Sequence, residues 1–401
     1  MKQRETLEKI RLVRLFFCCL ISSSQSFRDN LTILRGAMLN VNYRFLLATV
    51  LAIFFVVIYY KEVHTTQSRN RLSSKIDFSG EQWVERSEES VNEHCKCESW
   101  KSEKHHDFCY VDPQNSSSIG RKFDCSLVPL MESLNLIGET QELITLPEVI
   151  KDENQLVFVS ATSADHFNVS VNSLKSIRKY YPFHKYILYG LELNESDIQQ
   201  IPIDSNFEFR HFNTSCYPKF VNNWLAYHFK PLIIAEVMRE HSVILWIDAH
   251  IQIVKSGLIR NIYEDVAEKR LHGSYSSVFG FSETFHSNYA VLHPDVLTYF
   301  PSNSIGLLQT QQQVQAGYIF VPRTTYTMRF FKWWVLCALT ESCMSPPGTQ
   351  RKCKFTSDSN KVYANCFRYD QSILNLLLLN DFQDRSRYVI KSLEPTFIGV
   401  H

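Results

Sequence analysis

The chain has 401 residues, 45% of them hydrophobic and 21% charged, a composition that excludes a wholly disordered, collagen-like or coiled-coil protein. Its 42 Lys and Arg residues balance 41 Asp and Glu residues, and a formal net charge of +1 provides no overall field that would attract nucleic acid. There are 12 glycines, and the closest two are Gly273 and Gly280. The dinucleotide-binding, Walker and nucleophile-elbow motifs all need closer glycines and are therefore absent.

An uncharged apolar run at residues 45–60 is the strongest local signal. As a helix its 16 residues would span about 24 Å, enough for a thin bilayer. A buried core helix is the alternative. We expect a transmembrane helix at 45–60 and a cytosolic segment at 1–44, of which residues 1–37 are an optional extension because Met38 begins a more ordinary signal anchor.

Glycosylation sequons and cysteines follow this run. Nine of the 11 cysteines lie after it, and both features are typical of the lumenal side of a membrane. We therefore expect a single-pass type II glycoprotein of the Golgi or ER membrane with its C-terminal part in the lumen. The four sequons that follow the apolar run are at Asn115, Asn168, Asn194 and Asn213.

Residues 61–145 are polar and rich in charge, which is typical of an exposed stem. Four cysteines interrupt its later part, and we expect disulfides to hold that part against the following domain. They are Cys95, Cys97, Cys109 and Cys125.

Residues 146–401 alternate short apolar runs with helical patterns. This alternation, with strands apolar on both faces, predicts an α/β domain with a mostly parallel sheet flanked by helices. Ligands of such sheets bind beyond the carboxyl ends of the strands. The expected strands are 156–162, 185–191, 207–212, 243–253, 277–281, 318–321 and 388–390. The expected helices are 171–181, 194–201, 221–240, 326–339 and 370–379.

A long segment at residues 341–366 has no expected helix or strand. It contains Cys343, Cys353 and Cys366, and we expect at least one of them to form a disulfide. A flexible lid is the alternative.

Several segments of this domain resemble known families. It begins with VFVSATSADHF and SLKSIRKYYPFHKYILYGLEL, which resemble the opening of a nematode-expanded family, domain of unknown function 1647. The segment LWIDAHIQI lies where Golgi glycosyltransferases of the GT-A fold carry a strand-terminal D-x-D motif. Two later segments, QAGYIFV and FRYDQSILNLLL, are similar to acceptor-side segments of those enzymes. The resemblance covers the chain from about Ile150 to its end and implies a GT-A-like fold.

The resemblance also implies an activity, that of a hexosyltransferase-like glycosyltransferase. Such an enzyme transfers a sugar from a nucleotide-sugar donor to a glycan, lipid or protein acceptor. A non-catalytic lumenal or cell-surface binding protein on the same fold is the competing interpretation, because His250 stands where the motif has its second aspartate.

Glycosyltransferases of this fold commonly neutralise the diphosphate with a divalent cation, manganese or magnesium. Asp248 follows five apolar residues, and His250 would share its face in an extended chain. The resemblance adds the late His401 as a third metal ligand. The alternatives are that Asp248 caps a turn, that His250 is a surface histidine and that the chain end frays.

Four residues after the first strand are candidates for nucleotide binding. They are Ser160, Thr162, Asp165 and His166. The alternative for Asp165 is that it caps the N-terminus of the following helix.

Later residues complete the candidate site. Lys230 is a candidate for phosphate binding, or else a solvated helix lysine. Gln315 and Gly317 precede a strand, where a sugar would approach the backbone or the strand would bulge. Asp370 begins the DQSILN helix, where it caps the helix or meets the acceptor hydroxyl. The resemblance favours a catalytic role for Asp370, together with Asp248.

Overall fold

The computed structural model describes residues 92–99, 101–138, 142–201 and 204–399, all within the compact unit Asp77–His401. The predicted membrane helix at 45–60 and cytosolic segment at 1–44 lie outside the described residues. Among the residues that are described, no helix is both long and apolar enough to cross a membrane.

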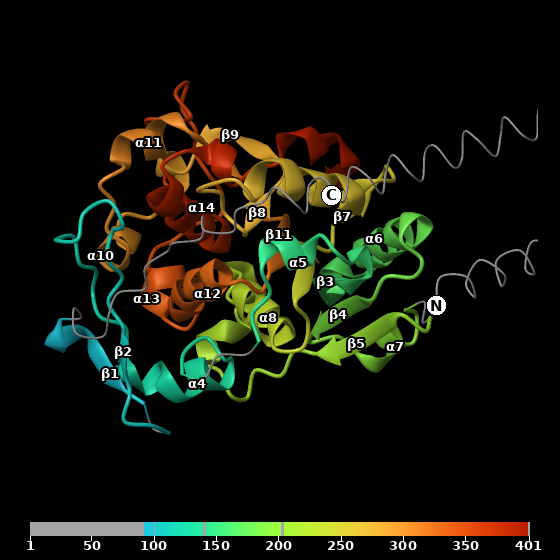
Figure 1. Ribbon diagram of the computed structural model, residues 1–401, viewed down its shortest axis with the longest axis horizontal. Helices are drawn as coiled ribbons and strands as arrows, with labels where there is room; N and C mark the ends of the chain where they lie inside the picture. Colours follow the sequence, from blue (N-terminus) through green and yellow to red (C-terminus); the bar gives the residue numbers. More distant parts are fainter. Residues whose placement is uncertain (1–91, 100, 139–141, 202–203, 400–401) are drawn as a thin grey trace, which may run out of the picture. The chain divides into compact units, whose positions relative to one another are not determined.

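A six-stranded sheet with the order β5-β4-β3-β6-β11-β8 forms the centre of the fold (Figure 1). The first four strands are mutually parallel, and β11 is antiparallel to both β6 and β8. Strands β3, β4, β6 and β11 are apolar on both faces because helices cover both sides of the sheet. This architecture confirms the expected α/β fold with a mostly parallel sheet. The strands are β3 Leu156–Ser163, β4 Tyr186–Leu191, β5 Phe207–His211, β6 Val243–Ile247, β8 Phe279–Gly280 and β11 Tyr318–Pro322.

Helices pack on both faces of this sheet. One apolar layer joins the sheet to α8 (Phe229–Met238), α12 (Thr325–Ala338) and α14 (Tyr369–Phe382). The opposite layer joins it to α6 (Phe167–Tyr180) and α9 (Leu258–Asp265). The shorter helices are α4 Val128–Ser133, α5 Leu146–Val149, α7 Glu195–Ile198, α10 Val296–Tyr299, α11 Ile305–Thr310 and α13 Glu341–Met344.

Three two-stranded sheets lie outside the central sheet. They pair β1 (Lys96–Glu98) with β2 (His105–Asp107), β9 (Glu283–Ser287) with β10 (Gln312–Val314), and β7 (Ile251–Ile253) with β12 (Phe397–Gly399). All three pairs are antiparallel. The last pair brings the C-terminal strand beside the segment that follows β6.

Three expected elements differ from the structure. The helix expected at 221–240 is α8 alone, because Tyr227 takes a left-handed conformation with φ of 56° just before it. The strand expected at 243–253 is divided into β6 and β7 by a turn in which Ile251 N donates to Asp248 O over 3.0 Å. Around 388–390 there is only an isolated bridge between Gly280 and Val389, and the last strand is β12.

Four disulfides hold the described part of the chain together. Two of them, Cys95–Cys109 and Cys97–Cys125, fasten the end of the predicted stem, whose Phe108 and Phe123 are buried in the main apolar layer. The other two are Cys337–Cys343 and Cys353–Cys366, which confirms the expectation for the segment 341–366.

Candidate functional site

The candidate site lies at the point where the order of the parallel strands reverses. From β3 the chain builds β4 and β5 on one side and then returns to place β6 on the other side of β3. In open α/β sheets the crevice at the carboxyl ends of two such strands is the usual ligand site. Asp248 directly follows β6 at this point, as the sequence predicted.

A buried lysine joins the two candidate catalytic carboxylates. The Lys230 ammonium, on α8, lies 3.0 Å from Asp248 Oδ1 and 2.8 Å from Asp370 Oδ2. It also donates to the carbonyl of Ala316 over 3.0 Å. These contacts occupy its three donors, so Lys230 anchors the carboxylates and has no proton left for a phosphate.

Charge keeps this cluster together. Burial lowers the pKa of Lys230, but Asp248 and Asp370 outweigh burial and raise it above the ordinary value, so the ammonium stays charged. Burial also raises the pKa of Asp370, and the attraction of Lys230 offsets this only in part. The cluster thus combines one basic side chain with two acidic ones.

The second oxygen of Asp248 is the open part of the cluster. Asp248 Oδ1 accepts a hydrogen bond of 2.7 Å from Trp246 Nε1, whereas Oδ2 has only a 3.4 Å contact with Lys230. The side chain of Asp248 is 20% exposed. A Cβ on Gly317 would lie 3.5 Å from Oδ2, so the glycine leaves the space beside this oxygen open.

This open oxygen suits a divalent cation. A partly exposed carboxylate oxygen is the type of ligand that manganese and magnesium prefer. His250 follows in the turn after Asp248, although this turn means that the two residues are not in the extended conformation that the sequence suggested. Strand β12 ends opposite Ile251, the neighbour of His250. His401, the third predicted ligand, lies outside the described residues.

A chain of side-chain amides supports the neighbouring backbone. Gln371 Oε1 accepts from Ala316 N over 3.0 Å, and Gln371 Nε2 donates to Gln313 Oε1 over 2.5 Å. Asn375 bonds both the N–H and the carbonyl of Val314. Sequence reasoning did not identify Gln371 or Asn375, although their spacing of four residues on one helix face indicated a shared role.

The residues predicted after β3 divide into two pairs. Ser160 and Thr162 are buried within β3, and Ser160 lies near the Tyr186 hydroxyl, so their side chains offer no surface to a nucleotide and that prediction is corrected. Asp165 and His166 are exposed at the carboxyl end of β3. A 2.5 Å hydrogen bond from Ser163 Oγ, together with the neighbouring His166, lowers the pKa of the Asp165 carboxyl. Asp165 caps neither helical segment after β3.

Two further predictions also change. Asp370 is nearly buried, with its carboxylate engaged by Lys230, and it does not cap α14. Gln315 donates from Nε2 to the carbonyl of Glu283 over 3.3 Å, so it is directed toward β9, away from Asp248. The register of the β9–β10 pair shifts between Gln312 and Val314, so an irregularity does occur at this edge.

Comparison with known families identifies one region of the chain. Residues 95–235 match the family described as protein of unknown function DUF1647. This confirms the family resemblance that the sequence indicated. The matched region includes Lys230, whereas Asp248 and Asp370 lie beyond it. No curated protein matches the chain significantly.

Solved structures with some similarity to this chain include glycosyltransferases. A galactosyltransferase LgtC in complex with donor and acceptor sugar analogues has 13% identity and a TM-score of 0.33, over 55% of this chain and 70% of LgtC. An active-site mutant of LgtC gives the same values. The apo form of the glycosyltransferase GlyE from Streptococcus pneumoniae TIGR4 has 14% identity and a TM-score of 0.31, over 56% of this chain and 43% of GlyE.

Outside the candidate site, one group of three residues of types that can bind metals has its ligand atoms within 4.8 Å of one another, among the residues that the structure describes. It comprises Cys95, Asp107 and Cys109. Because Cys95 and Cys109 are joined in a disulfide, neither offers the thiolate that a metal requires, and the group is structural.

Proposed function

We propose that this protein is a glycosyltransferase that transfers a sugar from a nucleotide-sugar donor to a glycan, lipid or protein acceptor. The observation that carries the proposal is the position of Asp248 at the reversal of strand order, with one oxygen held by Trp246 and Lys230 and the other open beside Gly317. A nucleotide sugar needs a crevice of this kind with a group that neutralises its diphosphate.

We propose that a divalent cation supplies this neutralisation. Asp248 Oδ2 is its first ligand, and His250 and His401 are the further candidates. When bound, the cation stabilises the negative charge of the departing diphosphate. The open space beside Gly317 then receives the sugar, and the exposed Asp165 and His166 face the nucleotide.

Asp370 has a positioning role in this proposal. It holds Lys230, and Lys230 holds Asp248 in the orientation that leaves Oδ2 open. The adjoining Gln371 fixes the backbone N–H of Ala316 next to Gly317. The catalytic contribution that the sequence suggested for Asp370 is therefore indirect.

We also propose that the protein is a single-pass type II membrane protein of the Golgi or ER, with residues 92–399 in the lumen. The four disulfides support this location because such bonds persist in oxidising compartments.

A panel of nucleotide sugars, tested by thermal shift with manganese and again with EDTA, tests the proposed function. One nucleotide should raise the melting temperature in manganese, because a ligand that binds only the folded state stabilises it. Asp248→Asn should abolish the shift, and His250→Ala should weaken it less, since water can replace one ligand. Asp295→Asn, which removes an exposed carboxylate outside the site, is the matched control.

Two results would contradict parts of this proposal. Equal nucleotide binding in EDTA and in the Asp248→Asn variant would reject the metal and leave a metal-free transferase. If no nucleotide stabilises the wild-type protein under any condition, the transferase proposal fails.

A non-catalytic binding protein is the second candidate function. The burial of Asp370 favours it, because the carboxylate that was expected to meet the acceptor is engaged by Lys230. Such a protein would bind a sugar or nucleotide without turning it over, and product analysis after incubation with the stabilising nucleotide sugar distinguishes the two functions.

A further inference from the structure

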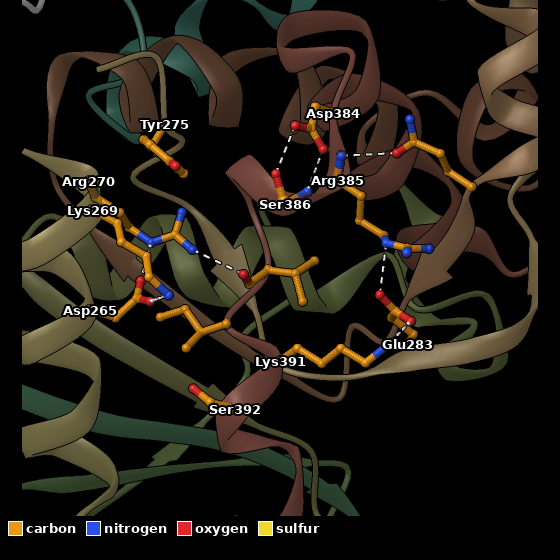
Figure 2. Close-up of a pocket in the computed structure, with 13 residues that line it drawn as sticks. Asp265, Lys269, Arg270, Tyr275, Glu283, Asp384, Arg385, Ser386, Lys391 and Ser392 are labelled. Atoms are coloured by element: carbon orange, nitrogen blue, oxygen red, sulfur yellow. Dashed lines mark hydrogen bonds and ion pairs between the residues drawn. The ribbon is translucent and has the colours of Figure 1, made fainter. Parts of the chain in front are cut away.

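A polar pocket of about 540 Å³ lies between the end of α9, strand β9 and the segment that follows α14. Figure 2 shows two charged clusters on opposite sides of this pocket, one around Asp265 and the other around Glu283. None of its lining residues belongs to the candidate site at Asp248.

The first cluster is built on an unusual helical turn. Helix α9 continues into a π-helical turn, Val266–Arg270, which places both Lys269 and Arg270 against Asp265. The distances to the carboxylate are 3.1 Å for Lys269 Nζ and 2.8 Å for Arg270 Nε. Arg270 also donates to the carbonyls of Arg387 and Val389. Turns of the π type occur often at functional sites.

The second cluster repeats this arrangement with residues from three segments. Glu283 on β9 is 2.8 Å from Arg385 Nε and 3.1 Å from Lys391 Nζ. Each cluster therefore has two cations on a single carboxylate. With Asp384 also in the lining, four basic side chains face three carboxylates, so the pocket has a net excess of one positive charge.

In each cluster the lysine is more exposed than the carboxylate that it contacts. The two carboxylates are covered, with 8% of Asp265 and 10% of Glu283 exposed, whereas Lys269 is 59% and Lys391 66% exposed. Asp384, the third acid of the lining, keeps its negative charge and accepts hydrogen bonds from the backbone N–H and hydroxyl of Ser386. An incoming ligand thus meets ammonium groups at both ends.

The remaining lining indicates the rest of the ligand. Two hydroxyl side chains, one amide and the Tyr275 ring complete the polar lining, next to the apolar Val389 and Ile390; the hydroxyl and amide residues are Ser386, Ser392 and Gln311. Pockets for apolar molecules are lined mainly by hydrophobic side chains, whereas this one suits a ligand rich in hydroxyl groups. Its volume falls in the range of pockets that hold small molecules.

We propose that this pocket binds an acidic saccharide whose sulfate or carboxylate groups pair with Lys269 at one end and Lys391, with Arg385, at the other. Charge-assisted hydrogen bonds to such anions are stronger than those between neutral groups. The proposal does not rest on the transferase activity, because the pocket shares no residue with the cluster around Asp248.

Calorimetry on the purified full-length protein tests this proposal. The probes are a heparin-derived tetrasaccharide, its desulfated form, which keeps the carboxylates, and a neutral maltotetraose. The wild type should bind the heparin tetrasaccharide, and binding of the desulfated form identifies carboxylate as sufficient. Maltotetraose should not bind measurably.

Paired variants locate the site. Lys269→Gln with Lys391→Gln should weaken binding of the acidic tetrasaccharide by roughly tenfold for each lysine, since a hydrogen bond to a charged group contributes about this factor. Lys255→Gln with Lys352→Gln removes two exposed lysines outside the pocket and should leave binding unchanged. Asp248→Asn should also leave it unchanged, which separates this site from the nucleotide site.

Three results would overturn the proposal. The first is that the wild type binds neither the heparin tetrasaccharide nor its desulfated form. The second is that maltotetraose binds as tightly as the acidic tetrasaccharides. The third is that the Lys255→Gln, Lys352→Gln pair loses as much affinity as the Lys269→Gln, Lys391→Gln pair. Melting temperatures of both paired variants accompany the titrations, so that a loss of folded protein is not read as a loss of binding.

Discussion

Lys230 Nζ lies 2.8 Å from Asp370 Oδ2, and both side chains are almost fully buried. The two residues come from α8 and α14, so their ion pair fastens the first half of the domain to the last helix. Removing one partner leaves the other charge buried, which is far less favourable than replacing the pair as a whole.

Lys230→Met should therefore destabilise the protein by about 3–5 kcal/mol. Urea unfolding, followed by tryptophan fluorescence, measures this loss. Lys175→Met, an exposed lysine on α6, is the control and should change the free energy of unfolding little. A loss below about 1 kcal/mol for Lys230→Met would show that the pair is not a buried ion pair in solution.

Gly317→Ala tests the open space beside Asp248. The new methyl group would lie 3.5 Å from Asp248 Oδ2, an ordinary contact, so the free energy of unfolding should change little. It would occupy the space proposed for the cation and sugar, so manganese-dependent nucleotide stabilisation should fall. Gly273→Ala, where nothing lies within 4 Å of the added atom, is the matched control. Unchanged nucleotide stabilisation in Gly317→Ala would place the ligand elsewhere.

Two disulfides of different loop length should differ in their effect on stability. Cys97–Cys125 joins residues 28 apart, whereas Cys337–Cys343 joins residues 6 apart. Loop-closure entropy assigns them about 3.6 and about 2.2 kcal/mol. Denaturant unfolding of the two Cys→Ala double variants gives both values. If the short-loop variant lost more stability, native-state packing would outweigh the entropy of the unfolded chain.

His228 predicts a dependence of stability on pH. Burial lowers its pKa to about 4, and the hydrogen bond to the Ala338 carbonyl offsets this only in part. The unfolded state, with a pKa near 6.5, takes up a proton first as the pH falls. The contribution of neutral, buried His228 to the free energy of unfolding is therefore complete above pH 6.5. About 3 kcal/mol of this contribution is lost as the pH falls from 6.5 to 4.

Free energies of unfolding of the wild type and His228→Gln at pH 7.5 and 5 test this dependence. The wild type should lose more stability than the variant across this interval. His272→Gln, an exposed histidine, should behave as the wild type. Equal pH dependence in all three proteins would mean that His228 titrates normally.

Glycosylation tests the proposed orientation. Full-length protein from cells should shift in mobility after endoglycosidase treatment, and Asn→Gln changes at all four sequons should remove the shift. In the folded structure the Ser170 hydroxyl of the Asn168 sequon is buried and bonds Phe167 O, so this site should be modified least. Asn154→Gln, outside any sequon, should leave the shift intact. An unglycosylated protein that is inserted in the membrane would reverse the orientation.

The sequence predicted the strands better than it predicted the turns. Strands β3, β4, β6 and β11 are apolar on both faces, and such continuous apolar runs can be recognised directly in the sequence. The turn after Asp248 cannot, because the apolar residues on both sides of it read as a single strand. The turn is closed by the hydrogen bond from Ile251 N to Asp248 O, directly after Asp248 N makes a last contact with Gly317 O of the neighbouring strand segment.

The types of residue in the candidate site could be predicted from the sequence, but not which of these residues contact one another. Asp248 and Asp370 were identified as carboxylates at element ends, and Lys230 as a possible phosphate ligand. That Lys230 instead joins the two depends on the packing of α8 against the sheet and α14, which no local spacing encodes. Ser160 was misplaced for a related reason, since a small polar residue within an all-buried strand resembles one at its open end.

The ion pairs of Lys230 also bear on how fragments of this protein should be chosen for experiments. The region that matches DUF1647 ends at residue 235, inside α8, and so includes Lys230 without β6 or either carboxylate partner. A fragment trimmed to that region would present a buried ammonium to an incomplete sheet. The boundary of sequence similarity is therefore not the boundary of an autonomous folding unit, and truncations should retain the chain through β12.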